Sequence, residues 1–169
     1  MTTVQKKKSL FTKGFTLIEL LVVITIISTL AVVVFVALNP AQRLKDARDA
    51  RRTSDVDSIL TAIHSQIVDN KGTGPTNLTT TEQQLGTAAS GCAIATGGCA
   101  VTATACADLM TGANNLSKYL KSMTTDPLSG TAGTTKYSAI QDSNGLVTIR
   151  ACATGTGTTE GTNNILSSR

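Results

Sequence analysis

Hydrophobic and polar positions divide the chain into three segments. Residues 1–14 are polar and basic, whereas residues 20–38 are apolar and carry no charge. From residue 56 to residue 67, apolar side chains recur at helical spacing among charged ones. Beyond residue 72 the chain is rich in Thr, Gly, Ala and Ser. The pattern predicts one long helix, apolar and then amphipathic, followed by a small polar domain.

The apolar segment is long enough to cross a membrane. A membrane-spanning helix needs about 20 residues, and residues 20–38 form an uncharged run of nearly that length. Lysines precede the run, so the N-terminus is expected to stay in the cytoplasm while the rest is exported. A secretory signal peptide is the rival interpretation. Its apolar core is usually about 7–15 residues long, and no A-x-A cleavage site follows this longer run.

The amphipathic segment covers residues 39–71. Pro40 removes one helical hydrogen bond and crowds the carbonyl of Val36, so a kink is expected there, but no stop. One face of this segment carries an apolar stripe of Val56, Ile59, Ile63 and Ile67. The stripe is expected to pack on residues 72–169. Lys71-Gly72 is a typical helix end.

Residues 72–169 are expected to form the small extracytoplasmic domain. Residues 73–90 suggest a polar loop, and residues 107–123 have apolar spacing that predicts a short helix. The β-rich runs "KYSAI" and "LVTIRAC" flank Asn144-Gly145, a strong hairpin signal. The tail, residues 154–169, is low in complexity and expected to be loosely ordered. The fold class is therefore α+β, a long helix packed on a small domain with an antiparallel hairpin or sheet.

Charge is concentrated at the N-terminus. The net charge of +4 comes from Lys6, Lys7, Lys8 and Lys13, and the remainder has 11 basic and 11 acidic residues. The basic balance therefore indicates a cytoplasmic flank of a membrane segment, and no nucleic-acid partner is required.

Four cysteines follow the apolar run, at Cys92, Cys99, Cys106 and Cys152. An even number in a region with few large apolar residues predicts disulfides in an oxidising compartment. The favoured pairing is Cys92–Cys99 with Cys106–Cys152, and Cys92–Cys106 with Cys99–Cys152 is the alternative. A zinc site is less consistent with the spacing, which lacks C-x2-C pairs. No metal site and no cofactor are expected.

The stretch "KGFTLIELLVVITIISTLAVVV" strongly resembles the class III signal and N-terminal helix of type IV pilins and type II secretion pseudopilins. The resemblance rests on a short basic leader, Gly14 followed by Phe15, Glu19 four residues later, and an unbroken apolar helix. It covers about residues 13–38. The chain departs from the family in one respect, because the familiar helix proline lies nearer the cleavage site than Pro40 does.

The resemblance implies a sequence of events for the chain. A prepilin peptidase would cut between Gly14 and Phe15, remove the leader of residues 1–14, and methylate the new amino group of Phe15. The mature subunit would then leave the inner membrane through pilus or secretion assembly machinery. It would polymerise with residues 15–38 in the filament core.

Glu19 is unfavourable at membrane depth, because placing a carboxylate there costs about 2.5–3.5 kcal/mol of free energy on insertion scales. The amine that cleavage creates on Phe15 of a neighbouring subunit would be its partner, which makes Glu19 an assembly carboxylate. In the alternative interpretation Glu19 lies near the interface and reaches headgroup water.

Three other groups carry weaker signals. His64 is the one histidine, and nothing in the sequence marks it as catalytic, so no enzymatic function is expected. Asp142, Ser143 and Asn144 are better explained as a turn than as a Ca2+ site, because the EF-hand spacing is absent. A basic cluster could bind DNA or anionic lipid, but the interleaved aspartates favour ion pairs; it comprises Arg43, Lys45, Arg48, Arg51 and Arg52.

The sequence thus predicts a structural subunit of a type IV pilus or pilus-like filament. Two alternatives stay open, a monomeric membrane-anchored binding module and a pseudopilin of a secretion or DNA-uptake system. The identity of the N-terminal residue distinguishes the anchored module from the other two.

Overall fold

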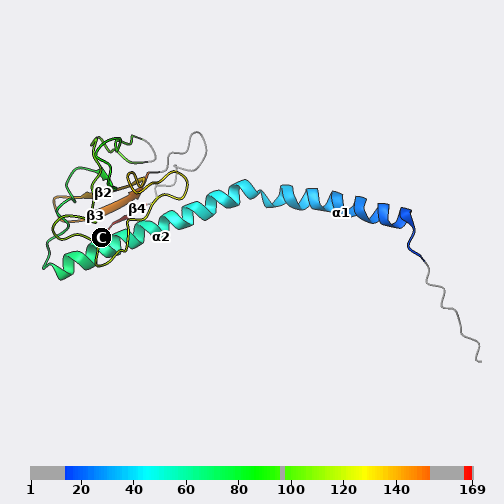
Figure 1. The fold of residues 1–169 in the computed structure, drawn as a ribbon, viewed down its shortest axis with the longest axis horizontal. Helices are drawn as coiled ribbons and strands as arrows, with labels where there is room; N and C mark the ends of the chain where they lie inside the picture. Colours follow the sequence, from blue (N-terminus) through cyan, green and yellow to red (C-terminus); the bar gives the residue numbers. More distant parts are fainter. Residues whose placement is uncertain (1–13, 96–97, 153–165, 169) are drawn as a thin grey trace, which may run out of the picture. The chain divides into compact units, whose positions relative to one another are not determined.

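The computed structural model describes residues 14–95, 98–152 and 166–168. The chain forms two compact units, Met1–Arg43 and Leu44–Arg169, which are described separately. Figure 1 shows the helices and strands along the chain. The helices are α1 (Leu17–Leu38) and α2 (Pro40–Asp69), and the strands are β1 (Gln83–Gln84), β2 (Tyr137–Gln141), β3 (Val147–Ala151) and β4 (Leu166–Ser168). The strands form one antiparallel sheet in the order β1-β2-β3-β4, so the predicted α+β class is confirmed.

Helix α1 is a 22-residue apolar helix that buries none of its side chains. It begins after Thr16, an extended N-cap residue whose hydroxyl accepts a hydrogen bond from the Glu19 N–H. Many of its residues are β-branched, yet the segment is helical, as expected where a backbone must satisfy its own hydrogen bonds in lipid. Among the described residues, the helical stretch that starts here is the one long and apolar enough to cross a membrane.

The two helices are separated by one residue. Asn39 takes a left-handed conformation (φ 40°, ψ 69°), and Pro40 is the first residue of α2. Proline suits a first helical position because its missing N–H would have no partner there. The carbonyl of Asn39 then accepts from the Gln42 N–H at 3.0 Å. The sequence predicts one helix bent at Pro40, whereas the structure interrupts the helix at Asn39.

Helix α2 supplies one side of the domain core. Val56, Ile59 and Ile63 are almost fully buried, and Ile67 packs against the same cluster, so the predicted stripe is confirmed. Figure 1 shows α2 lying along the side of the sheet. From the sheet and the preceding loops the core takes, among others, Leu85, Leu109, Leu116, Tyr137, Val147 and Ile149.

The predicted hairpin is formed by β2 and β3, which pair from Tyr137↔Ala151 to Gln141↔Val147. Its turn is fixed by Asp142, whose carboxylate Oδ1 accepts from the N–H groups of Asn144 (2.9 Å) and Leu146 (2.7 Å). Gly145 has a φ of 88°, a conformation that glycine adopts without a steric cost. The Asn-Gly signal is therefore confirmed, with Gly145 as its left-handed residue.

Two local predictions for the domain are wrong. Residues 107–123 form turns rather than a short helix, because Gly112 (φ 85°) and Asn114 (φ 54°) leave the helical region. Leu109 and Leu116 are both buried in the core, and the Leu116 N–H donates to the Leu109 carbonyl at 2.8 Å. The second error is in the loop at 73–90, which contains strand β1.

The predicted loose tail lies largely outside the described residues, which exclude 153–165 and 169. Of the tail, Leu166–Ser168 is described as strand β4, paired with Thr148, Ile149 and Arg150 of β3. The tail therefore contributes an edge strand to the sheet.

The four cysteines form two disulfides, as predicted, but the favoured pairing is wrong and the alternative pairing is the one found. The bonds join Cys92 to Cys106 and Cys99 to Cys152. An antiparallel bridge between Ile94 and Val101 explains this pairing. It folds the chain back on itself, so the segment that follows Val101 runs beside Cys92 and brings Cys106 close to it. The Cys92 N–H accordingly donates to the Thr104 carbonyl at 3.1 Å. Cys99 lies between the bridged residues and meets Cys152 just after β3.

Removing the disulfides should destabilise the domain unequally. The Cys99–Cys152 bond closes a separation of 53 residues and the Cys92–Cys106 bond one of 14. In the chain-entropy model these bonds contribute about 4 and about 3 kcal/mol. We therefore expect the double variant Cys99→Ala/Cys152→Ala to melt at a lower temperature than Cys92→Ala/Cys106→Ala. Equal melting temperatures would contradict the assignment, and non-reducing peptide mapping checks the pairing directly.

Candidate functional site

The segment before α1 is open on all sides. Gly14 and Phe15 lie outside the helix, and a Cβ atom added at Gly14 would meet nothing within 4 Å. Phe15 is 75% exposed. Nothing in the described part of the chain therefore requires a glycine at position 14, and a requirement for glycine there must come from another molecule.

The Glu19 carboxylate is held by the residue that caps α1. The Thr16 N–H and the Thr16 hydroxyl both donate to Oε2, at 2.8 and 2.9 Å. Together with the Glu19 N–H to Thr16 Oγ1 bond, these contacts form a capping box. Oε1 has no hydrogen-bond partner in the described part of the chain. The spacing T-x-x-E is a sequence signal for a capping box, and the prediction for Glu19 did not include this role.

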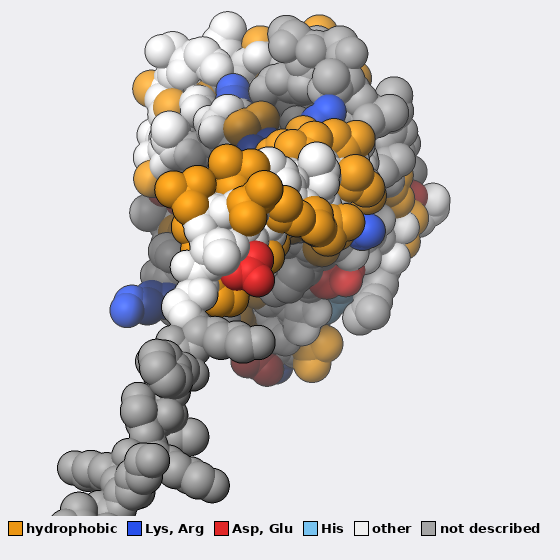
Figure 2. Space-filling model, turned by 90° about the vertical axis from the view of Figure 1, so that its right-hand side faces the viewer, with side chains coloured by type: hydrophobic (Ala, Val, Ile, Leu, Met, Phe, Trp, Pro, Cys, Tyr) orange, Lys and Arg blue, Asp and Glu red, His pale blue; other side chains and the backbone are white. Residues whose placement is uncertain are grey.

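The surface of α1 is hydrophobic and grooved. Glu19 lies beside a groove of ≈360 Å³ lined by Phe15, Ile18, Val22 and Val23, and a second groove of ≈450 Å³ is lined by Ile27, Leu30, Ala31, Val34, Phe35 and Leu38. Hydrophobic side chains gather on the face that Figure 2 shows. Soluble monomers rarely expose so large a contiguous apolar surface, which marks contact with a membrane or with other proteins.

In the domain, two arginines of the basic cluster form ion pairs with aspartates. Arg52 is 1% exposed; its Nε donates to Asp126 Oδ2 at 2.6 Å and its guanidinium to Asp49 Oδ1 at 2.7 Å. Arg51 lies 3.8 Å from Asp55, on the surface. The prediction that aspartates pair with this cluster is confirmed for these two arginines. Burial lowers the pKa of Arg52, but the bonds to Asp126 and Asp49 raise it more, so Arg52 stays charged.

Two tyrosines extend the same set of contacts. The Tyr137 hydroxyl donates to Asp55 at 2.8 Å, and the Tyr119 hydroxyl donates to Asp69. Burial and the Asp55 bond raise the pKa of Tyr137, and the Asp69 bond raises that of Tyr119. Both tyrosines remain neutral hydrogen-bond donors, which fits a structural role.

Acid should weaken the domain through Asp126. Burial raises the pKa of the Asp126 carboxyl, but the bonds from Arg52, Leu128 and Ser129 lower it more, to below its ordinary 3.8. A carboxyl with a lowered pKa stabilises the fold above its unfolded pKa and loses this contribution as the pH falls through the folded value. As the pH is lowered below about 4, the melting temperature should therefore decrease, and it should decrease less steeply in Asp126→Asn than in wild type. Parallel slopes in thermal melts of the two proteins would contradict this role.

The remaining candidates show no catalytic arrangement. His64 is half-buried on α2, and its Nε2 has no hydrogen-bond partner in the described structure. The Asp142 carboxylate is taken up by its own turn, and no cluster of three metal-ligating side chains occurs among the described residues. Ser143 and Asn144 are exposed turn residues.

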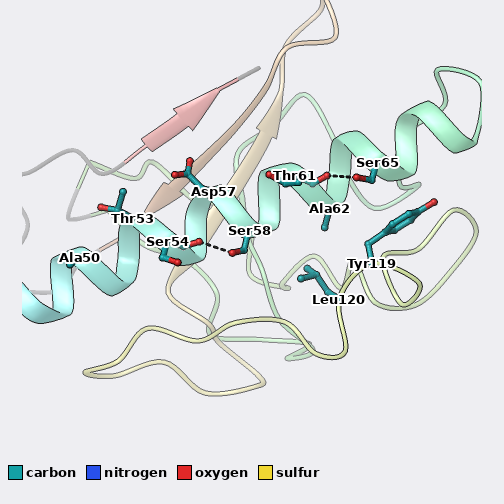
Figure 3. A pocket seen from close by; sticks show the side chains of 10 residues that line it. All are labelled: Ala50, Thr53, Ser54, Asp57, Ser58, Thr61, Ala62, Ser65, Tyr119 and Leu120. Atoms are coloured by element: carbon teal, nitrogen blue, oxygen red, sulfur yellow. Dashed lines mark hydrogen bonds between the residues drawn. The ribbon is translucent and has the colours of Figure 1, made fainter.

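A groove of ≈790 Å³ runs along the outer face of α2 beside Tyr119 and Leu120 (Figure 3). Small hydroxyl residues line it, but Ser58 donates to the Ser54 carbonyl and Ser65 to the Thr61 carbonyl, at 2.7 and 2.9 Å. These hydroxyls satisfy their own helix and are not activated as nucleophiles.

The comparison with known families agrees with the geometry of α1. The model of the prokaryotic N-terminal methylation motif matches residues 12–35. The chain carries the class III signal of type IV pilin-like proteins. Searches of the curated proteins and of the solved structures found no match.

The pilin signal spans Gly14, Phe15, Thr16 and Glu19, the residues whose geometry is described above. It implies processing by a prepilin peptidase and assembly into filaments. Proteins with this signal are structural rather than enzymatic. A single apolar helix with this signal fits a chain that is first anchored in a membrane and then enters an extracellular filament.

Proposed function

We propose that this chain is a structural subunit of a type IV pilus or pilus-like filament, polymerised through its N-terminal helix. One observation carries the proposal: a helix that starts at a pilin signal has 22 residues and buries none of them. A neighbouring copy of the helix presents the same kind of apolar surface, so lateral packing would remove both from water.

The proposed route begins in the inner membrane, with residues 1–14 in the cytoplasm and residues 39–169 outside. A prepilin peptidase cuts after Gly14 and methylates Phe15, after which residues 15–38 leave the lipid and enter the filament core. Residues 39–71 carry the domain of residues 72–169 on the filament surface. The leader lysines support this orientation, because basic flanks stay in the cytoplasm.

Glu19 would pair with the amine of Phe15 on a neighbouring subunit. The Thr16 bonds occupy Oε2, so Oε1 is available to accept from that amine. A buried charge pair of this kind fixes register, because a shifted neighbour leaves both charges unpaired. Thr16 would then support assembly by holding the carboxylate in position.

The test is the N-terminus and the state of the mature protein. Mass spectrometry should find Phe15 as the first residue, with a methylated amine, and electron microscopy should find filaments containing the chain. A monomeric membrane-anchored binding module would retain Met1 or Thr2 and form no filaments. The class III signal is shared by pili and by pseudopili of secretion and uptake systems, so a pseudopilin remains within the proposal.

Gly14→Val should block processing. The chain itself has room for a side chain at position 14, so the constraint would lie in the peptidase, where the substrate backbone must approach closely. We expect an uncut precursor in the membrane, longer by the 14-residue leader. A gel shift with intact mass measures it. Thr12→Val, before the cleavage position, is the control and should be cut normally; a Phe15 terminus in Gly14→Val would refute the prediction.

A further inference from the structure

A small apolar cavity of ≈280 Å³ opens on the surface of the domain. Leu109, Met110 and Met123 form its apolar lining, with Gly86 and Ala132 beside them. Methionine side chains are flexible and adapt to the shape that fills a gap. At ≈280 Å³ the cavity lies just below the roughly 300–1,000 Å³ of small-molecule sites, so it suits an apolar side chain from another polypeptide.

The rim of the cavity carries a lysine without an ion pair. Lys121 is exposed and forms no ion pair in the described part of the domain. Asp108 also lines the cavity, but its carboxylate accepts from the Met110 N–H and the Thr111 hydroxyl in its own turn, both at 2.9 Å, and makes no ion pair with Lys121 in the described part of the domain. The cavity therefore suits an apolar side chain with a carboxylate beside it that can reach Lys121.

The domain presents one such group itself. Leu146 is 44% exposed at the tip of the β2–β3 hairpin, beside Asp142. The Asp142 carboxylate accepts hydrogen bonds from Asn144 and from the Leu146 N–H, all inside its own turn, and has no cationic partner among the described residues. The tip thus combines an apolar side chain with an uncompensated negative charge.

The other exposed apolar side chains of the domain do not have this combination. Asp69, beside Val68, is bonded to Tyr119, and Asp126, near Leu128, is paired with the buried Arg52. Leu44 lies between two cationic residues, and Leu166 pairs across the sheet with a cationic residue, Arg150.

We propose that Leu146 of one copy inserts into the Met110–Met123 cavity of the next copy, with Asp142 facing Lys121. The tip and the cavity share no residue, so the contact is heterologous and can repeat along a filament rather than close on itself. This inference rests on the proposed filament function and names a contact between its outer domains.

Cross-linking in filaments tests the contact. The full-length chain with Met123→Cys and Leu146→Cys is expressed where it assembles, and sheared filaments are treated with a short bismaleimide. The matched control is Met123→Cys with Leu166→Cys, because Leu166 is 43% exposed, like Leu146, but lies on the edge strand β4. We expect a ladder of covalent oligomers from the Leu146 pair alone, and its loss when filaments are dissolved in detergent before the reagent is added.

The outcomes separate the two proposals. Filaments that give no ladder, or the same ladder with the Leu166 pair, would overturn the contact and leave the filament function standing. A wild-type protein that makes no filaments at all would overturn both.

Charge variants test the same contact in a second way, without introduced cysteines. Asp142→Asn keeps the Oδ1 acceptor that the N–H groups of the turn use, and it removes the charge together with the longer 3.3 Å bond from the Asn144 side chain to Oδ2. Lys121→Gln and Asp142→Asn should each lower filament yield by about two- to five-fold, as for an exposed ion pair, and the double variant should lose no more than either single one. Additive losses, or normal yields from both single variants, would overturn the pairing of these charges.

Discussion

The variant Glu19→Leu should enter the membrane normally and fail to form filaments. Leucine removes a carboxylate that costs about 2.5–3.5 kcal/mol at membrane depth, so insertion is not impaired. Assembly loses the acceptor for the Phe15 amine of the neighbouring subunit, and that amine is left buried and unpaired at a cost of about 3–5 kcal/mol per contact. The measurement is filament yield by shearing and electron microscopy, alongside the amount of protein in the membrane fraction.

The control variant is Thr25→Leu on the same helix. Thr25 is also a polar residue in α1, but its hydroxyl bonds to the Val22 carbonyl at 2.8 Å, inside the helix. Its replacement should therefore leave filaments in near-normal amounts. Normal filament yield from Glu19→Leu would refute the assembly role. Failure of both variants would show that assembly rejects any added leucine, whatever its charge effect.

The variant Ile63→Asp should unfold the domain in a soluble fragment of residues 41–169. Ile63 is fully buried at the centre of the α2 stripe, so a carboxylate there would be desolvated without a partner. We expect a loss of about 3 kcal/mol or more in the free energy of unfolding. Thermal melts compare this variant with wild type and with Ser58→Asp.

Ser58 is the matched position because it lies on the same helix and faces the open groove in Figure 3. An aspartate there remains in water, so the expected cost is under about 0.5 kcal/mol. Equal melting temperatures for the three fragments would mean that α2 does not dock on the sheet in solution, and the pilin-like arrangement of the domain would have to be abandoned.

The parts of the fold that depend on local sequence were predictable. The periodicity of α2, the apolar run of α1 and the Asn144-Gly145 turn all act over a few residues, and each was found where it was expected. The pilin signal is equally local, which is why Gly14, Phe15 and Glu19 could be named from the sequence.

The parts that depend on distant partners were not predictable. Strand β1 has only two polar residues and exists because Gln83 and Gln84 pair with β2, more than 50 residues away. The Arg52–Asp126 pair spans 74 residues. In residues 107–123 the seven-residue spacing of Leu109 and Leu116 fits a helix, but it also fits a turn that brings both leucines into one core. Gly112, with its positive φ, decides for the turn.

The Cys99–Cys152 bond imposes an order on export. Cys152 follows β3, so this bond cannot close until β1, β2 and β3 have all crossed the membrane. Cys92 and Cys106, only 14 residues apart, can be oxidised earlier. During that interval Cys99 has no correct partner, and an oxidant that reaches it can join it to Cys92 or Cys106 instead. Correction of such bonds takes seconds to hours, so the pace of translocation relative to the local oxidase would set how many subunits mature without help from an isomerase.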